Sequence, residues 1–153
     1  MRLSIGSDHN GFHLKKIIIG YLGEQGYPCD DLGTYSTQAV DYPDIALKLC
    51  EQILEGKYER GILICGTGIG MAIVANKVPG IRAAQVQDPY SAERASKSNN
   101  VQIITLGAQV VGEELAKMLV NTWLHSEFSS GRSAPKLAKI AQIDERFRQL
   151  KPR

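Results

Sequence analysis

The residues with the clearest capacity for chemistry lie in ICGTGIG, residues 64–70, where an apolar run ends in a cysteine and enters a glycine-rich loop. Glycines at every second position let backbone N–H groups turn toward a ligand without interference from a Cβ atom. Such a loop, followed by a helix start, can hold a phosphate or an oxyanion that develops during a reaction. A thiol beside it is favoured as a thiolate base or nucleophile. Cys65 equally suits the last core position of a strand, because free cysteines are commonly buried, so both interpretations stay open.

Three familiar uses of a glycine loop are disfavoured by the residues around it. A dinucleotide-binding loop, G-x-G-x-x-G, needs a glycine where this chain has Met71, whose side chain would block close packing of helix on strand. A nucleotide P-loop would end in G-K-[ST], which does not follow here. A cysteine-dependent phosphatase would place an arginine about six residues after the thiol to grip phosphate, and Met71 stands there too.

Composition places the chain among globular proteins of one domain, residues 1–153, with 43% hydrophobic and 22% charged residues. The net charge of +2 is too small to indicate a nucleic-acid partner, although residues 132–153 hold seven Lys/Arg and two acids. That basic cluster suits either an anionic ligand or a solvated helix. Three scattered cysteines form neither a disulfide framework nor a zinc pattern, which favours a reducing cytoplasm. Neither a secretory signal nor a membrane-spanning segment is predicted.

Hydrophobic periodicity predicts alternation of strand and helix along the whole chain. Strands are expected at 2–8, 27–33, 61–65, 81–86 and 101–107, and helices at 11–26, 43–56, 70–78, 89–100, 111–128 and 135–150. Strands that are apolar on both faces, with helices between them, predict a three-layer α/β domain around a parallel, doubly wound sheet. Ligands of such sheets bind beyond the carboxyl ends of the strands, which directs attention to residues 7–11, 65–70 and the turn after Val86.

Several motifs together resemble the B-type ribose-5-phosphate isomerases, a family that includes galactose- and allose-6-phosphate isomerases. They are GSDHNGFHLK (6–15), VDYPD (40–44), ILICGTGIGMAIVANKVPGIRAA (62–84), PYSAERAS (89–96), GAQVVG (107–112) and the GR pair at 131–132. The resemblance implies a Rossmann-like α/β/α sandwich with a five-stranded parallel sheet and catalysis without metal or organic cofactor. It also implies a homodimer whose active site is built from both chains, with the helix at about 135–150 packing on the partner. Pairing of dimers into tetramers stays open.

The resemblance assigns the proton-carrying base to Cys65, for interconversion of an aldose and a ketose phosphate through a cis-enediolate. Gly66, Gly68 and Gly70 would supply donors to the enediolate oxygen. The Thr67 hydroxyl would exchange a proton with a sugar oxygen, although a loop-capping role explains it as well. His9 and His13 share a helical spacing but lack a third ligand, so no metal site is predicted.

The substrate-binding residues are also carried over from the family. Asp8 would accept hydrogen bonds from sugar hydroxyls, or instead cap the next helix. By resemblance His9 approaches the phosphate or ring oxygen, and Arg132 binds the phosphate. Lys136 and Gln109 stand where many members have arginine, which suggests a phosphate grip that is weakened or reshaped for another substrate.

Ser98 is the most informative departure, because many members have there a histidine taken to open the sugar ring. Asn99 is retained and can bind a hydroxyl. Serine is a poor base without a partner, which leaves several explanations open. Ser98 acts all the same, or His13 or Asp8 opens the ring in its place. Otherwise the ring opens spontaneously, or the substrate never forms a ring. An aldotetrose 4-phosphate has its O4 blocked and cannot form a furanose. The expected substrate is ribose 5-phosphate; the alternatives are allose, galactose or tetrose phosphates, or a non-catalytic sugar-phosphate-binding subunit.

Overall fold

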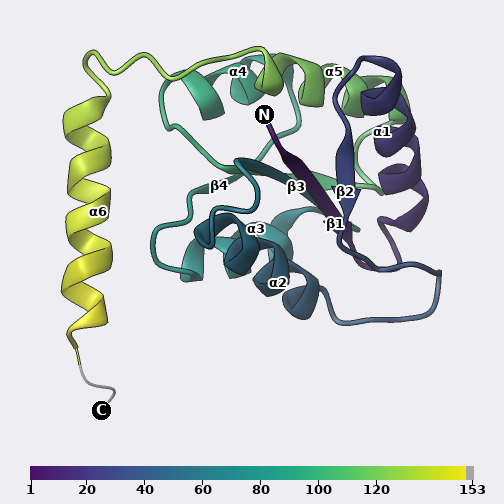
Figure 1. The fold of residues 1–153 in the computed structure, drawn as a ribbon, viewed down its shortest axis with the longest axis horizontal. Helices are drawn as coiled ribbons and strands as arrows, with labels where there is room; N and C mark the ends of the chain where they lie inside the picture. Colours follow the sequence, from purple (N-terminus) through teal and green to yellow (C-terminus); the bar gives the residue numbers. More distant parts are fainter. Residues whose placement is uncertain (151–153) are drawn as a thin grey trace.

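The computed structural model describes residues 1–150, and within them strand and helix alternate as predicted (Figure 1). The elements are β1 (Leu3–Ser7), α1 (Phe12–Glu24), β2 (Cys29–Asp31), α2 (Tyr42–Leu54), β3 (Arg60–Cys65), α3 (Ile69–Lys77), β4 (Ala83–Gln85), α4 (Pro89–Lys97), β5 (Ile103–Gly107), α5 (Glu113–Leu124) and α6 (Ala134–Arg148). The last three residues of the expected domain, 151–153, lie outside the described part. Within residues 1–150, no helix is long and apolar enough to cross a membrane.

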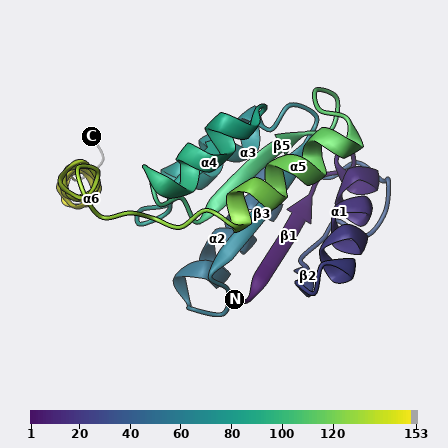
Figure 2. The same cartoon turned by 90° about the horizontal axis from the view of Figure 1, so that it is seen from above.

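The five strands described form one parallel sheet in the order β2-β1-β3-β5-β4. Helices α1, α4 and α5 cover one face, and α2 and α3 cover the other (Figures 1 and 2). The predicted three-layer α/β/α fold is therefore confirmed. Both faces of the sheet are covered because its strands are apolar on both sides.

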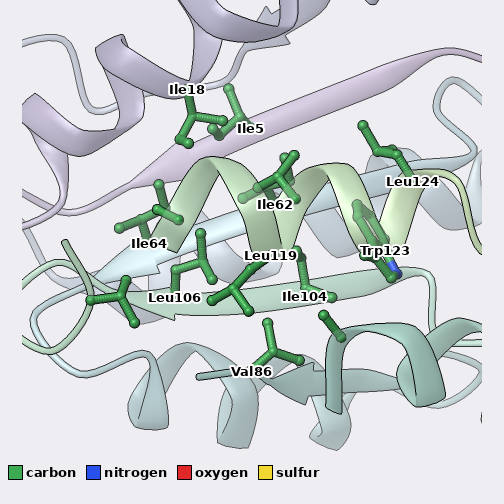
Figure 3. Close-up of a cluster of buried hydrophobic side chains, with 14 of the residues drawn as sticks. Ile5, Ile18, Ile62, Ile64, Val86, Ile104, Leu106, Leu119, Trp123 and Leu124 are labelled. Carbon is green, nitrogen blue, oxygen red and sulfur yellow. The ribbon is translucent and has the colours of Figure 1, made fainter. Parts of the chain in front are cut away.

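Strand β3 shows how the sequence produces the two cores. Ile62 and Ile64 point into the cluster under α1, α4 and α5, which Figure 3 shows around Ile5 and Trp123. Leu63 and Cys65 alternate to the opposite face, into the cluster under α2 and α3. The two-residue period of a strand thus aims the Cys65 side chain toward the helix that follows it.

The chain order reverses between β1 and β3, which lie side by side in the centre of the sheet. Their ends are tied together, because Ser7 pairs with Ile64 and the Asp8 amide donates to the Ile64 carbonyl at 3.2 Å. In doubly wound sheets this reversal leaves a crevice beyond the carboxyl ends of the two strands, where ligands bind. The loops carrying Asp8 and Cys65 leave the sheet at that point.

Helix α5 ends at Leu124, four residues before the predicted end at 128. The Arg60 guanidinium donates to the carbonyls of Trp123 and Ser126 at 2.8 and 3.0 Å. Together with Ser96 Oγ, which donates to the Trp123 carbonyl at 3.0 Å, these bonds provide partners for carbonyls where the helix ends.

Helix α6 stands apart from the rest of the chain, as Figures 1 and 2 show. Along its described length, Ala134–Arg148, no residue is buried. Its apolar side chains Ile140, Ile143 and Phe147 are 40%, 56% and 60% exposed. One polar link to the body is the Gly80 amide, which donates to the Asp144 carboxylate at 2.9 Å. An amphipathic helix normally buries its apolar face, so α6 lacks its packing partner within one chain.

Candidate active site

Cys65 ends β3 at the boundary between the core and a surface hollow. Its side chain belongs to the cluster under α2 and α3, and the residue is 5% exposed. Its Sγ accepts a hydrogen bond from the Gly68 amide at 3.1 Å. Gly68 itself has φ of +79°, in the left-handed region, so the chain turns sharply into α3 directly after this N–H. A backbone donor aimed at sulfur stabilises a thiolate.

The hollow beside the sulfur has a volume of about 480 Å³ and lies at the predicted edge of the sheet. The residues around it come from four separate segments of the chain. They include Asp8, Tyr42, Cys65, Gly66, Thr67 and Gly70. The hollow therefore brings together Asp8, Cys65, Thr67 and two of the three glycines expected to form the enediolate cradle, Gly66 and Gly70. The third, Gly68, is not among its lining residues, and its N–H is directed at the sulfur instead.

Asp8 is 4% exposed, and its carboxylate is tied into the turn before α1. Oδ1 accepts from the amides of Asn10 and Gly11 at 2.9 and 3.1 Å. The turn-capping interpretation of Asp8 is therefore part of its role. A carboxylate has two oxygens and several acceptor positions, so it can bind a sugar hydroxyl at the same time.

Thr67, like Asp8, can make a structural hydrogen bond and contact a ligand at the same time. Its Oγ1 accepts from the Ile69 amide at 3.2 Å, at the first residue of α3. This is the loop-capping bond that the sequence analysis left as an alternative. A hydroxyl that accepts one bond still has its own proton to donate, so the side chain can exchange a proton with a ligand.

His9 is oriented by the segment before α2. The Val40 amide donates to His9 Nδ1 at 3.2 Å, which assigns the proton of the neutral ring to Nε2. The ring is half-buried, and among residues 1–150 it is not one of those that line the hollow beside Cys65.

Arg132 and Lys136, which were expected at the phosphate, lie in a second hollow of about 410 Å³, where α4 ends and α6 begins. Ser98, Asn99, Arg132 and Lys136 line it together. Gln109, also expected at the phosphate, lines the hollow beside Cys65 instead. Within residues 1–150 the two hollows share no lining residue. Within one chain, Arg132 and Lys136 are therefore not among the residues that line the hollow beside Cys65.

The other two cysteines are in environments that oppose ionisation. Burial raises the pKa of Cys29 to about 12, and the carboxylates of Asp30 and Asp31 add to the effect. Burial raises the pKa of Cys50 to about 11. Both thiols therefore stay protonated near neutral pH.

Two polar residues at this edge of the sheet were missed by the sequence analysis. Gln85, at the end of β4, donates from Nε2 to the Thr67 carbonyl at 2.6 Å. Thr105 of β5 donates from Oγ1 to the Gly68 carbonyl at 2.8 Å. The available signal was a polar side chain at the carboxyl end of an otherwise apolar strand, in IRAAQV and in VQIITLG.

Comparison with known proteins decides what this arrangement belongs to. The model of the family described as "Ribose/Galactose Isomerase" matches residues 3–140. The chain belongs to this family. A ribose-5-P isomerase B of Listeria innocua is 50% identical over 148 residues, covering 97% of this chain and 100% of the relative. A D-erythrulose-4-phosphate isomerase of Pectobacterium atrosepticum is 51% identical over 145 residues, covering 94% and 95%.

Solved structures agree with the family assignment. The ribose-5-phosphate isomerase B of Clostridium thermocellum superposes with a TM-score of 0.94 at 46% sequence identity, covering 96% of this chain and 99% of that one. The ribose/galactose isomerase fold therefore extends over nearly the whole of this chain, including both hollows.

Proposed function

We propose that this chain interconverts an aldose phosphate and a ketose phosphate through a cis-enediolate, with ribose 5-phosphate and ribulose 5-phosphate as the first pair and Cys65 as the base. Membership of the ribose/galactose isomerase family makes the chain a sugar-phosphate isomerase. The observation that carries the finer proposal is the Gly68 N–H aimed at the Cys65 sulfur, at the wall of a hollow large enough for a sugar phosphate.

The proposed reaction moves two protons, one from C2 to C1 and one from O2 to O1, and no other atom. The Cys65 thiolate removes the C2 proton of the open-chain aldose, and the electron pair of that C–H bond forms the C1–C2 double bond of the enediolate. Negative charge on O1 is stabilised by backbone amides of the glycine loop. Proton transfer between O1 and O2, through the Thr67 hydroxyl, is followed by return of the proton from sulfur to C1, which gives the ketose.

The complete site is proposed to need two copies of the chain. The sulfur and the enediolate cradle line one hollow, and Arg132 and Lys136 line another. Helix α6 carries Lys136 and stands apart with exposed Ile140 and Ile143, which suits packing on a second subunit. In a two-fold dimer the basic hollow of each subunit would complete the sulfur hollow of its partner. Two cations would then bind the dianionic phosphate.

Complementation between two inactive variants tests the base and the shared site together. Cys65→Ala is expected to lower kcat by roughly 10²–10⁴, the usual contribution of a positioned acid–base group. Arg132→Ala is expected to raise KM for the phosphate substrate. Unfolding and refolding the two variants together in equal amounts should recover about a quarter of the wild-type rate, because half the dimers are mixed and each mixed dimer has one intact site.

The control is each variant refolded alone and assayed at a substrate concentration well below the KM of Arg132→Ala, where each should show far less activity than the mixture. Absence of recovery in a mixture shown to contain mixed dimers would place both residues in one chain's site and refute sharing. Near-wild-type turnover by Cys65→Ala would remove the sulfur from the mechanism. Tight binding of sugar phosphates by the wild type without any turnover would favour the non-catalytic subunit.

A tetrose 4-phosphate is the second candidate substrate, and Ser98 favours it. Neither Ser98 nor Asn99 is a base near neutral pH, so the hollow that would receive the ring offers no obvious group to open it. A substrate that cannot cyclise needs none, and the Pectobacterium relative is named for a four-carbon substrate. A panel of four-, five- and six-carbon aldose phosphates, allose and galactose 6-phosphates included, decides between them. Ser98→His should accelerate the cyclic substrates alone; no gain would mean that another group already opens the ring.

A further inference from the structure

One peptide group, between Thr67 and Gly68, has partners at both ends. Its N–H donates to the Cys65 sulfur at 3.1 Å. Its carbonyl oxygen, on Thr67, accepts from Gln85 Nε2 at 2.6 Å. A chain of two hydrogen bonds therefore runs from the side chain of an edge strand, through one peptide, to the proposed base.

Gln85 reaches this peptide from the far side of β5. It ends β4, which is the edge strand of the described sheet and pairs with β5 from Ala83 to Gln85. Its partner lies 18 residues back in the chain, in the loop between β3 and α3. The bond therefore clamps the glycine loop to the sheet from the side opposite Asp8.

Thr105 and Gly107 of the neighbouring strand β5 contact the same loop. Thr105 Oγ1 donates to the Gly68 carbonyl at 2.8 Å. A Cβ at Gly107 would lie 2.6 Å from the carbonyl carbon of Thr67, so the two backbones are in direct contact there. These contacts set the position of the peptide, and the bond from Gln85 sets the direction in which its carbonyl, and hence its N–H, points.

We propose that Gln85 is a positioning residue for the isomerase, which orients and polarises the Thr67–Gly68 peptide so that its N–H supports a negative charge on the Cys65 sulfur. Hydrogen bonds in a chain polarise one another, so a donor at the carbonyl strengthens the N–H of the same amide as a donor. The proposal rests on the proposed role of Cys65. Gln85 itself need not touch the substrate.

The titratable groups that face the sulfur hollow come from other elements. Asp8 follows β1 and Tyr42 begins α2, while the lining residues of α3 and the β5–α5 turn, including Gln109, are uncharged. Replacing Gln85 by methionine keeps the length of the side chain, removes the donor and changes no charge. A change in the ionisation of Cys65 in Gln85→Met would therefore come from the lost hydrogen bond.

The test is the pH dependence of Cys65 alkylation by iodoacetamide, followed by mass spectrometry of the peptide that contains it. Cys29 and Cys50 serve as internal references, since their raised pKa values keep them protonated. In Gln85→Met the midpoint of the Cys65 profile should rise by about 0.5–1 pH unit. The kcat should fall about tenfold with KM within about twofold, since outer hydrogen-bond partners commonly carry effects of this size. Gln25→Met, at an exposed glutamine directly after α1 and outside the candidate ligand loops, is the matched control and should leave both unchanged.

Gln85→Lys, whose ammonium can donate to the same carbonyl and also adds a positive charge, should return the midpoint to the wild-type value or below it. A midpoint in Gln85→Met equal to that of Gln25→Met overturns the proposal, and so does an equal rise in Gln85→Met and Gln85→Lys. Should Gln85→Met fail to fold, Gln85→Ala takes its place with the same readout. Alkylation needs no turnover, so failure of this proposal is distinguishable from failure of Cys65 as the base.

Discussion

Gly68→Ala is expected to destabilise the protein far more than the same change two residues later. Gly68 precedes α3 and has φ of +79°, a conformation in which a Cβ approaches the following carbonyl oxygen. Its own Cβ would also lie 2.9 Å from the Leu106 carbonyl carbon and 3.2 Å from the Gly107 nitrogen. Both atoms belong to the backbone of β5, which cannot retreat without breaking its ladder with β3.

The size of the effect follows from these two costs. A left-handed alanine costs about 1–2 kcal/mol, and overpacking against a rigid neighbour adds typically about 1–3 kcal/mol. The free energy of unfolding should therefore fall by roughly 2–5 kcal/mol, a large part of the ~5–15 kcal/mol that a domain has. Turnover should fall as well, because the displaced amide is the one that contacts Cys65.

Gly70→Ala is the matched control in the same loop. Its Cβ would lie 2.5 Å from Cζ of the Tyr42 ring, which is the end of a side chain 38% exposed and free to rotate outward. Gly70 is already helical, so alanine regains up to ~1 kcal/mol of helix propensity. The net change in stability should stay within about 1 kcal/mol, while Tyr42 leaves its place at the hollow.

Urea unfolding followed by the fluorescence of Trp123 gives the comparison, since this is the one tryptophan of the chain and it is fully buried. All proteins are measured at one concentration, because assembly would add to apparent stability. A free energy for Gly68→Ala within about 0.5 kcal/mol of that for Gly70→Ala would refute the reasoning from left-handed strain and backbone contact.

Two further predictions concern buried charge and buried thiols. Asp31→Asn should lower the free energy of unfolding by roughly 2–4 kcal/mol, because it leaves the fully buried ammonium of Lys15 without the carboxylate that lies 2.6 Å away. Lys15→Met should lower it by less, because that change removes the buried charge itself. Urea titrations give both values, and the reverse order would contradict a charged Lys15. Burial raises the pKa of Cys29 to about 12 and of Cys50 to about 11 from 9.0, so above pH 9 the unfolded chain binds fewer protons than the folded one. Unfolding free energy should therefore fall as pH rises from 9 to 11, by up to about 1.4 kcal/mol per pH unit for each thiol, and a Cys29→Ala, Cys50→Ala double variant should flatten that slope.

The order of strands and helices was predictable because each element carries its own signal. The run GILIC alternates between two apolar faces, and prolines at 43, 89 and 135 stand in the first helical turns where they were expected. The general rule that ligands bind beyond the carboxyl ends of parallel strands was enough to predict which edge of the sheet holds the Cys65 loop. These are local patterns and one topological regularity, and neither needs knowledge of tertiary contacts.

Lys15 shows where local pattern fails. In the sequence it is one of two adjacent lysines on an amphipathic helix, which normally indicates a solvated face. In the structure it is fully buried, paired with Asp31 and donating to the Thr34 carbonyl. Its partners lie 16 and 19 residues further along, and nothing in the helix itself encodes them. For the same reason, local sequence patterns do not predict that Arg132 and Cys65 line different hollows within one chain.

The motif GTGIG determines the conformation of the glycine loop only in part. Those glycines free the loop to turn, but the loop rests on β5, where a Cβ at Gly107 would meet the carbonyl oxygen of Thr67 at 2.6 Å. Any larger residue there would lift the Thr67–Gly68 peptide away from the sulfur and break its bond to Gln85. The geometry at Cys65 therefore depends on Gly107, 42 positions later, and in our proposal also on the side-chain amide of Gln85 on the edge strand. A chain with the loop motif but without those two residues would have the thiol and lack the environment that we propose makes it a base.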